Sequence, residues 1–149
     1  MPRRSRASSM VLVEGQPVVL GDAKVTPVLT PGHTPGSMGV IFPVKEAGKT
    51  YIAGIYGGGT IGTITNGSIS EAQQFIRSLE HYQDWAKKLN VDVELQNHPV
   101  MDDFGAKLTA IRARKSGAQN PFVVGRENYM KFMDVWIECA KAGLARRQQ

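Results

Sequence analysis

The stretch that decides the fold is Leu29-Thr30-Pro31-Gly32-His33-Thr34-Pro35-Gly36, which sets a histidine in a constrained loop. The apolar and β-branched run over residues 25–29 precedes it and predicts a strand. Two prolines and two glycines restrict the loop backbone, and a restricted loop can hold an imidazole at a set angle. Taken alone, His33 is equally well interpreted as a metal ligand or as an ordinary loop histidine.

A second histidine follows a strand-like segment downstream. Residues 91–95 alternate apolar and polar side chains and then run into Gln96-Asn97-His98-Pro99. This pattern predicts a strand that ends in a histidine-bearing turn. Two strands that each end in such a turn are typical of metal sites, so the pair indicates a metal centre more strongly than either histidine alone.

The two motifs resemble those of the metallo-β-lactamase superfamily. Thr-Pro-Gly-His-Thr-Pro-Gly is similar to the motif that carries the third histidine of the first zinc site. Asn97-His98-Pro99 is similar to the later motif that supplies the last histidine of the second zinc site. The likeness is greatest to the third subclass of metallo-β-lactamases, and it covers nearly the whole chain but only the C-terminal half of the family's domain.

The resemblance implies an α/β layered fold. The family folds as an αββα sandwich, and this chain would supply one half, a mainly antiparallel sheet covered by about three helices. We expect this half-domain over residues 10–144, after a disordered basic leader at residues 1–9 and before a frayed tail at residues 145–149. The apolar pattern predicts helices over residues 71–89, 103–114 and 126–144, and short strands at residues 10–13, 17–20, 25–29, 38–44, 50–56 and 91–95.

The resemblance also implies zinc chemistry, with His33 on the first zinc and His98 on the second. The chain has three histidines and no His-x-His-x-Asp-His motif, which supplies four of the usual six ligands in the family. We therefore predict part of a zinc-dependent hydrolase, in which hydroxide attacks a β-lactam or a similar cyclic amide or ester. The chain alone would be inactive, with up to two zinc ions in a completed domain and none held by this half alone.

The alternative is a non-catalytic half-domain. A lone half leaves one apolar sheet face uncovered, and such a face requires a partner. Under either interpretation we expect a homo-oligomer or a complementary N-terminal half, with a small-molecule substrate only when the site is complete.

Several other residues are weaker candidates. Asp102 and Asp103 follow His98 closely and are either metal ligands or, more in keeping with a helix start, a cap and a favourable dipole charge. Tyr56, Gly57 and Gly58 are predicted to line a substrate pocket near the site. Many superfamily members have an aspartate at this point of the sequence that bridges the two metals. This stretch has no aspartate, which argues against a glyoxalase-type or nuclease-type site. His81 matches no metal motif and is predicted to lie on a helix surface.

Composition narrows the remaining function classes. The 149 residues carry a net charge of +5, concentrated in short basic clusters near both ends, without interleaved aromatic residues. That pattern favours solvated tails over nucleic-acid binding. No apolar run is long enough for a membrane span or a signal peptide, so we expect a cytoplasmic location for the chain as given, whereas full-length relatives are often periplasmic or secreted. The single cysteine, Cys139, excludes an internal disulfide and is predicted to be buried in a helix.

Overall fold

The computed structural model describes residues 11–149, so the predicted leader at residues 1–9 lies outside the described residues. Five strands form one sheet in the order β1-β2-β3-β4-β5, with antiparallel pairing throughout except for the parallel pair β4 and β5. The strands are β1 (Val18–Leu20), β2 (Ala23–Leu29), β3 (Met38–Glu46), β4 (Lys49–Ile55) and β5 (Val93–Leu95). The helices are α1 (Gly62–Asn66), α2 (Ile69–Leu89), α3 (Phe104–Arg112) and α4 (Arg126–Arg147).

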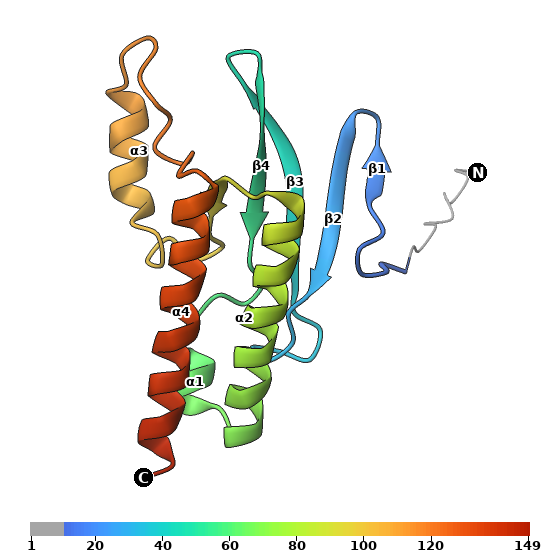
Figure 1. The fold of residues 1–149 in the computed structure, drawn as a ribbon, viewed down its shortest axis with the longest axis vertical. Coiled ribbons are helices and arrows are strands. Elements are labelled where there is room, and N and C mark those ends of the chain that lie inside the picture. The colour runs from blue at the N-terminus through green and yellow to red at the C-terminus, as the bar shows by residue number, and fades with distance from the viewer. Residues whose placement is uncertain (1–10) are drawn as a thin grey trace, which may run out of the picture.

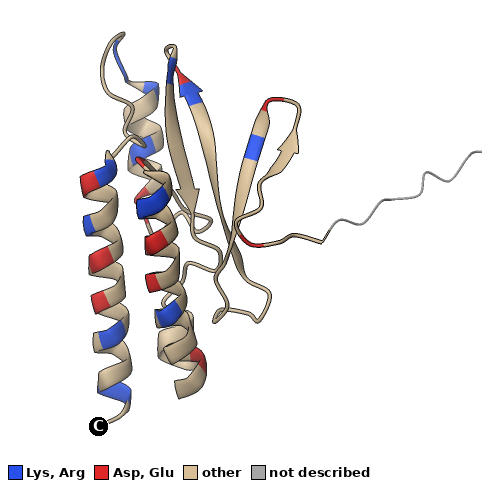
Figure 2. Cartoon of the chain, turned by 45° about the vertical axis from the view of Figure 1, so that its right-hand side comes forward, with Lys and Arg blue, Asp and Glu red and all other residues tan. Residues whose placement is uncertain are grey.

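Helices α2 and α4 lie side by side and cover one face of the sheet (Figure 1). In the turned view of Figure 2 the described helices lie on one side of the strands, so the molecule has a helical layer and a sheet layer. This arrangement confirms the predicted layered α/β fold with a mainly antiparallel sheet. There are four helices in residues 11–149 rather than about three, because α1 has only five residues and no apolar period to reveal it.

The long helix α2 has well-defined ends. It begins at a capping box in which the Ser68 hydroxyl accepts from the Glu71 amide at 3.2 Å while the Glu71 carboxylate accepts from the Ser68 amide at 2.7 Å. The helix ends where Asn90 adopts a left-handed conformation with φ of 59°, which confirms the predicted helix end at residue 89.

Two glycines let α2 pack closely on the sheet. A Cβ at Gly39 of β3 would lie 2.7 Å from the Tyr82 ring, and one at Gly54 of β4 would lie 2.7 Å from the Tyr82 hydroxyl. The bare backbone therefore makes room for a fully buried aromatic residue of α2. Tyr82, Phe75 and Trp136 form the centre of the core between the sheet and the two long helices.

The outer edge of β5 is covered by the segment that leads into α4. The Glu94 amide donates to the Phe122 carbonyl at 3.0 Å, and the Gly125 amide donates to the Asp92 carbonyl at 2.9 Å. Because these bonds occupy the backbone groups of the edge, β5 is held from both sides although it has only three residues.

The opposite face of the sheet has no helix over it among the described residues (Figure 2). Strand alternation places apolar side chains there, and the register brings them together across β3, β4 and β5. They are half-buried, unlike the fully buried residues under α2, and comprise Val40, Phe42, Val44, Tyr51, Ile55 and Leu95. This open apolar face is the uncovered sheet surface expected of a half-domain.

Several predictions about individual segments were wrong. Residues 11–13 form no strand. Helix α4 continues through Arg147, whose guanidinium donates to the carbonyls of Ile64 and Gly67, so the predicted frayed tail begins only after it. Cys139 is exposed rather than buried, because it lies on the outward side of α4. Within residues 11–149, no helix is both long and apolar enough to cross a membrane.

Candidate functional site

The two predicted metal histidines lie on turns at the same end of the sheet. Strand β2 ends at Leu29 opposite the start of β3, and the end of β4 pairs with the end of β5 through Ile55 and Leu95. The turns that carry His33 and His98 therefore leave the sheet at the same end of its strands, hereafter the sheet edge. Three strand spacings, or roughly 14 Å, separate the two strands that precede these turns.

The His33 loop is fixed by its own backbone. The Thr30 amide donates to the Ser37 carbonyl at 2.9 Å, and the Ser37 amide donates to the Thr34 carbonyl at 3.2 Å, which closes the loop into a compact turn. The loop is also tied to the core, because the Ser78 hydroxyl of α2 donates to the Pro31 carbonyl at 2.6 Å. The His33 side chain stands exposed on this rigid support.

The loop after β4 runs beside His33. Gly58 has φ of 77°, and a Cβ there would lie 2.6 Å from His33 Cβ. A Cβ at Gly57 would lie 2.1 Å from the Met38 carbonyl oxygen, so this residue packs against β3. Both glycines are therefore required for close backbone approach, and their predicted role in a substrate pocket stays a prediction.

Tyr56 does not line a pocket, contrary to the sequence prediction. Only 1% of the residue is exposed, and its ring lies edge-on to Phe75, Tyr82 and Trp136. Burial raises the pKa of the Tyr56 hydroxyl above its usual value. An aromatic residue directly after a buried strand is more often core than site, and here the core interpretation is correct.

A pocket of about 270 Å³ opens beside His33. Its wall is formed by α1 and the start of α2, through Thr63, Asn66 and Glu71. Sequence analysis missed these residues because α1 is too short to show a helical period.

The His98 imidazole is held by its neighbour. Asn97 Oδ1 lies 2.9 Å from His98 Nδ1 and, as an amide oxygen, can only accept, so His98 donates through Nδ1. A neutral imidazole in this tautomer has its free lone pair on Nε2, which is the arrangement that a metal-binding histidine requires. His98 is half-buried, whereas His33 is exposed.

The two aspartates after His98 do not act as free ligands. The Asp102 side chain is only 2% exposed and accepts from Lys107 Nζ at 3.0 Å. Asp103, with φ of 51°, occupies the predicted cap position of α3, but its side chain does not make the hydrogen bond of a cap. Residues 11–149 contain no cluster of three or more histidine, cysteine, aspartate or glutamate side chains that could hold a metal.

His81 lies on the surface of α2, as predicted. Its Nε2 is 2.7 Å from Glu14 Oε1, and the same carboxylate oxygen accepts from the Leu29 amide at 2.9 Å. Burial of Glu14 acts to raise its pKa, but the hydrogen bonds from His81 and Leu29 outweigh burial, and the pKa is lowered.

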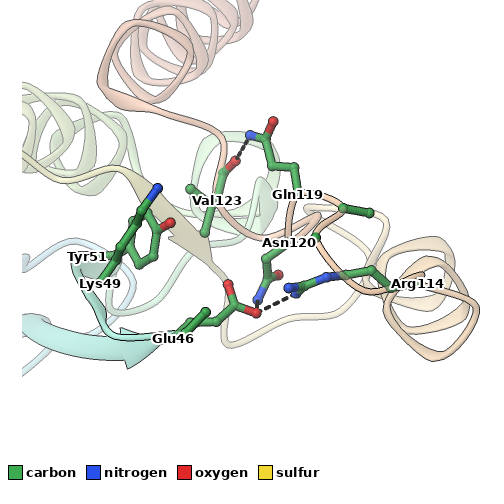
Figure 3. Close-up of a pocket in the computed structure, with 10 residues that line it drawn as sticks. Glu46, Lys49, Tyr51, Arg114, Gln119, Asn120 and Val123 are labelled. Carbon is green, nitrogen blue, oxygen red and sulfur yellow. Dashed lines mark hydrogen bonds and ion pairs between the residues drawn. The ribbon is translucent and has the colours of Figure 1, made fainter.

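A second, larger pocket lies at the other end of the sheet, beside the turn between β3 and β4 (Figure 3). Its volume is about 490 Å³, and the Glu46 carboxylate within it accepts from Arg114 and from Asn120. The hydrogen bond from Arg114 is the main cause that lowers the pKa of Glu46. None of the residues predicted for the site lines this pocket.

The known proteins that this chain resembles belong to one structural class. No family model and no curated protein matches the sequence. Among solved structures, the subclass B3 metallo-β-lactamase BJP-1 of Bradyrhizobium japonicum is 25% identical with a TM-score of 0.70, over 91% of this chain and 50% of that one. Native FEZ-1 metallo-β-lactamase from Legionella gormanii is 25% identical with a TM-score of 0.67, over 91% and 49%. A β-lactamase from Chitinophaga pinensis is 25% identical with a TM-score of 0.63, over 91% and 50%.

The chain spans about half the length of the solved structures that it matches. Its helical layer and its sheet layer correspond to one half of the layered domain in those structures. The chain has the fold of a half-domain of the metallo-β-lactamase superfamily, which confirms the resemblance predicted from the two histidine motifs.

Proposed function

We propose that this chain is the C-terminal half of a zinc-dependent hydrolase that acts on a β-lactam or a similar cyclic amide or ester. The observation that carries the proposal is the shared sheet edge, from which both the His33 loop and the His98 turn leave. Its fold likeness to subclass B3 metallo-β-lactamases supports the same chemistry.

The histidines of this chain fit a zinc ligand set in part. His98 donates through Nδ1 and therefore offers Nε2, and His33 is exposed on a fixed loop. Zinc, when bound, supplies a water activated near neutral pH. One imidazole per ion binds weakly, so the other ligands come from a complementary half that carries His-x-His-x-Asp-His.

The open apolar face supports such a complement. It is built from half-buried valine, phenylalanine, tyrosine and isoleucine side chains, and charged residues gather instead on the helices and hairpin tips (Figure 2). An apolar sheet face of this kind is suited to packing against a second sheet. The sandwich that results would place the complementary ligands opposite His33 and His98.

The proposal is tested by joining the chain to an N-terminal half of a subclass B3 enzyme that carries the His-x-His-x-Asp-His motif. We expect bound zinc and hydrolysis of a chromogenic cephalosporin in the joined protein. His33→Ala and His98→Ala should each lower turnover by more than about 100-fold, because each removes a direct ligand. His81→Ala is the matched control and should leave turnover within about twofold, because His81 contacts only the Glu14 carboxylate, which still accepts from the Leu29 amide in the variant. Equal turnover in all three variants would contradict the proposal.

A second candidate is a non-catalytic half-domain that pairs with a copy of itself. It is favoured by the same open face, together with the absence of a three-ligand group within residues 11–149. Elemental analysis of a size-exclusion peak of known mass separates the two. Near-zero zinc in a dimer peak supports the second candidate, whereas one or two zinc ions per chain with β-lactam turnover would exclude it.

A further inference from the structure

A buried cluster of three charges lies next to the His98 turn. Glu94 belongs to β5, Asp102 ends the turn, and Lys107 belongs to α3. Their side chains are 6%, 2% and 16% exposed, so all three charges are largely removed from water. Lys107 Nζ donates to Glu94 Oε2 and, at 3.0 Å, to Asp102 Oδ2.

The position of the two carboxylates relative to His98 gives the cluster its significance. Glu94 precedes His98 by four residues and Asp102 follows it by four, so the single ammonium of Lys107 joins the two ends of the turn. Gln96 adds a tie inside the turn, because its Nε2 donates to Glu94 Oε1 at 2.9 Å.

Lys107 is itself anchored. Its ammonium lies 5.3 Å from the centre of the Phe122 ring, and Phe122 belongs to the segment that covers the edge of β5. The Phe122 ring in turn packs against Phe104 at the start of α3, with ring centres 5.9 Å apart. The ammonium therefore lies between α3 and the segment that covers the edge of β5.

Buried charges make this connection selective for one geometry. A buried carboxylate is tolerated only when it is paired and hydrogen-bonded. Any conformation of the turn that draws Glu94 or Asp102 away from Lys107 leaves an unpaired charge in a dry environment. The cluster thus penalises every arrangement of residues 95–101 except those that keep both ion pairs.

We propose that Lys107 is a positioning residue that clamps the His98 turn at the sheet edge through Glu94 and Asp102. The importance of this clamp for catalysis rests on the proposed function, in which His98 holds zinc. The clamp itself is a property of the chain without metal. Lys107 has no free lone pair while it is protonated, so it acts through the geometry of the turn and not as a ligand.

The clamp is tested by hydrogen exchange of the 149-residue chain without metal. Lys107→Met removes the ammonium and keeps the apolar stem, and Lys107→Arg keeps the charge. Lys131→Met is the matched control, because Lys131 forms an exposed pair with Glu127 on α4. We expect the Met101 and Phe104 amides, which donate to the His98 and Pro99 carbonyls, to exchange at least about tenfold faster in Lys107→Met, while those of α2 and α4 are unchanged. Lys107→Arg should restore slow exchange, and Lys131→Met should match the parent chain.

If Lys107→Met does not fold, Asp102→Asn provides the same test, because it retains the pair between Lys107 and Glu94 and releases only the far end of the turn. Faster exchange confined to the Met101 and Phe104 amides supports the clamp. Unchanged exchange in the turn, or an equal increase throughout α2 and α4, overturns it, since the cluster would then be irrelevant to the turn or merely stabilise the whole fold. Because zinc is absent from this experiment, its result can contradict the clamp without contradicting the proposed metal site. Likewise, the turnover experiment can contradict the metal site without contradicting the clamp.

Discussion

The His33 loop and the His98 turn hold two imidazoles at the same sheet edge by different means. The His33 loop is fixed by backbone hydrogen bonds among its own residues and by Gly32, which packs against Phe75 of α2. The His98 turn lacks such a dense backbone network and is flanked by two buried carboxylates that share Lys107. One histidine is therefore positioned by local chain stereochemistry, and the other by ion pairs between separate elements.

The difference teaches what each region tolerates. A loop held by backbone packing is sensitive to the addition of a single methyl group and insensitive to charge. A turn held by buried ion pairs is sensitive to the loss of one charge even when the shape of the side chain is kept. The experiments that follow separate these two kinds of sensitivity.

The largest effect is expected from Gly32→Ala in the His33 loop. Gly32 has φ of 138°, and a Cβ there would lie 2.7 Å from Phe75 Cα in the backbone of α2. We expect the free energy of unfolding to fall by about 3 kcal/mol, because strain and a backbone clash combine. Gly36→Ala in the same loop has no atom within 4 Å of the new methyl group and should stay within about 0.5 kcal/mol. Denaturant unfolding measures both, and equal losses would contradict positioning by packing.

An intermediate effect is expected from Asp102→Asn at the His98 turn. The change keeps the shape of the side chain but removes the charge that faces Lys107 at 3.0 Å. We expect the free energy of local opening of the turn, measured by hydrogen exchange, to fall by about 2 kcal/mol, while the free energy of global unfolding stays within about 0.5 kcal/mol. Asp103→Asn is the adjacent control, since Asp103 is exposed and asparagine tolerates its φ of 51°, and it should change stability by less than about 0.5 kcal/mol. Similar values for the two variants would show that the ion pairs do not hold this region.

The smallest effect is a pH dependence at Glu14, which supports the strand before the His33 loop through the Leu29 amide. Its pKa is lowered in the folded chain below the ordinary value of 4.5, so a proton binds the unfolded chain more tightly. The stability that Glu14 contributes is therefore present above about pH 4.5 and is lost as the pH falls through the folded pKa. Urea unfolding from roughly pH 5 to roughly pH 3 should show the parent chain losing its advantage over Glu14→Gln. A difference that does not vary with pH would contradict this role.

Much of the fold could be predicted from the sequence, because its signals are local. Apolar residues at steps of three and four from Phe75 to Leu89 predict α2, and the short apolar segment over residues 38–44 predicts β3. The His33 loop could be identified for the same reason, since its prolines and glycines lie next to the residue that they constrain. Segments without a period, such as α1 and residues 11–13, were missed or misassigned.

The remainder of the site could not be predicted, because it depends on residues that meet only in space. Nothing in the spacing of Glu94, Asp102 and Lys107 indicates that one ammonium joins both carboxylates, and the sequence predicts Asp102 only as a metal ligand or a helix cap. Tyr56 was assigned to a pocket because its neighbours are glycines, whereas the packing of Phe75, Tyr82 and Trp136 places it in the core. Long-range packing decided both cases.

The parallel pairing of β4 with β5 also determines the order in which the site can assemble during folding. Strands β2, β3 and β4 follow one another through short turns, so their contacts close small loops and form at little entropic cost. β5 joins only after α1 and the whole of α2 have crossed over the sheet, which makes its contacts the most distant in sequence among the strand pairs. We therefore expect refolding followed by pulse-labelled hydrogen exchange to show protection in β2–β4 before β5, so that the His33 edge exists before the His98 turn is set beside it.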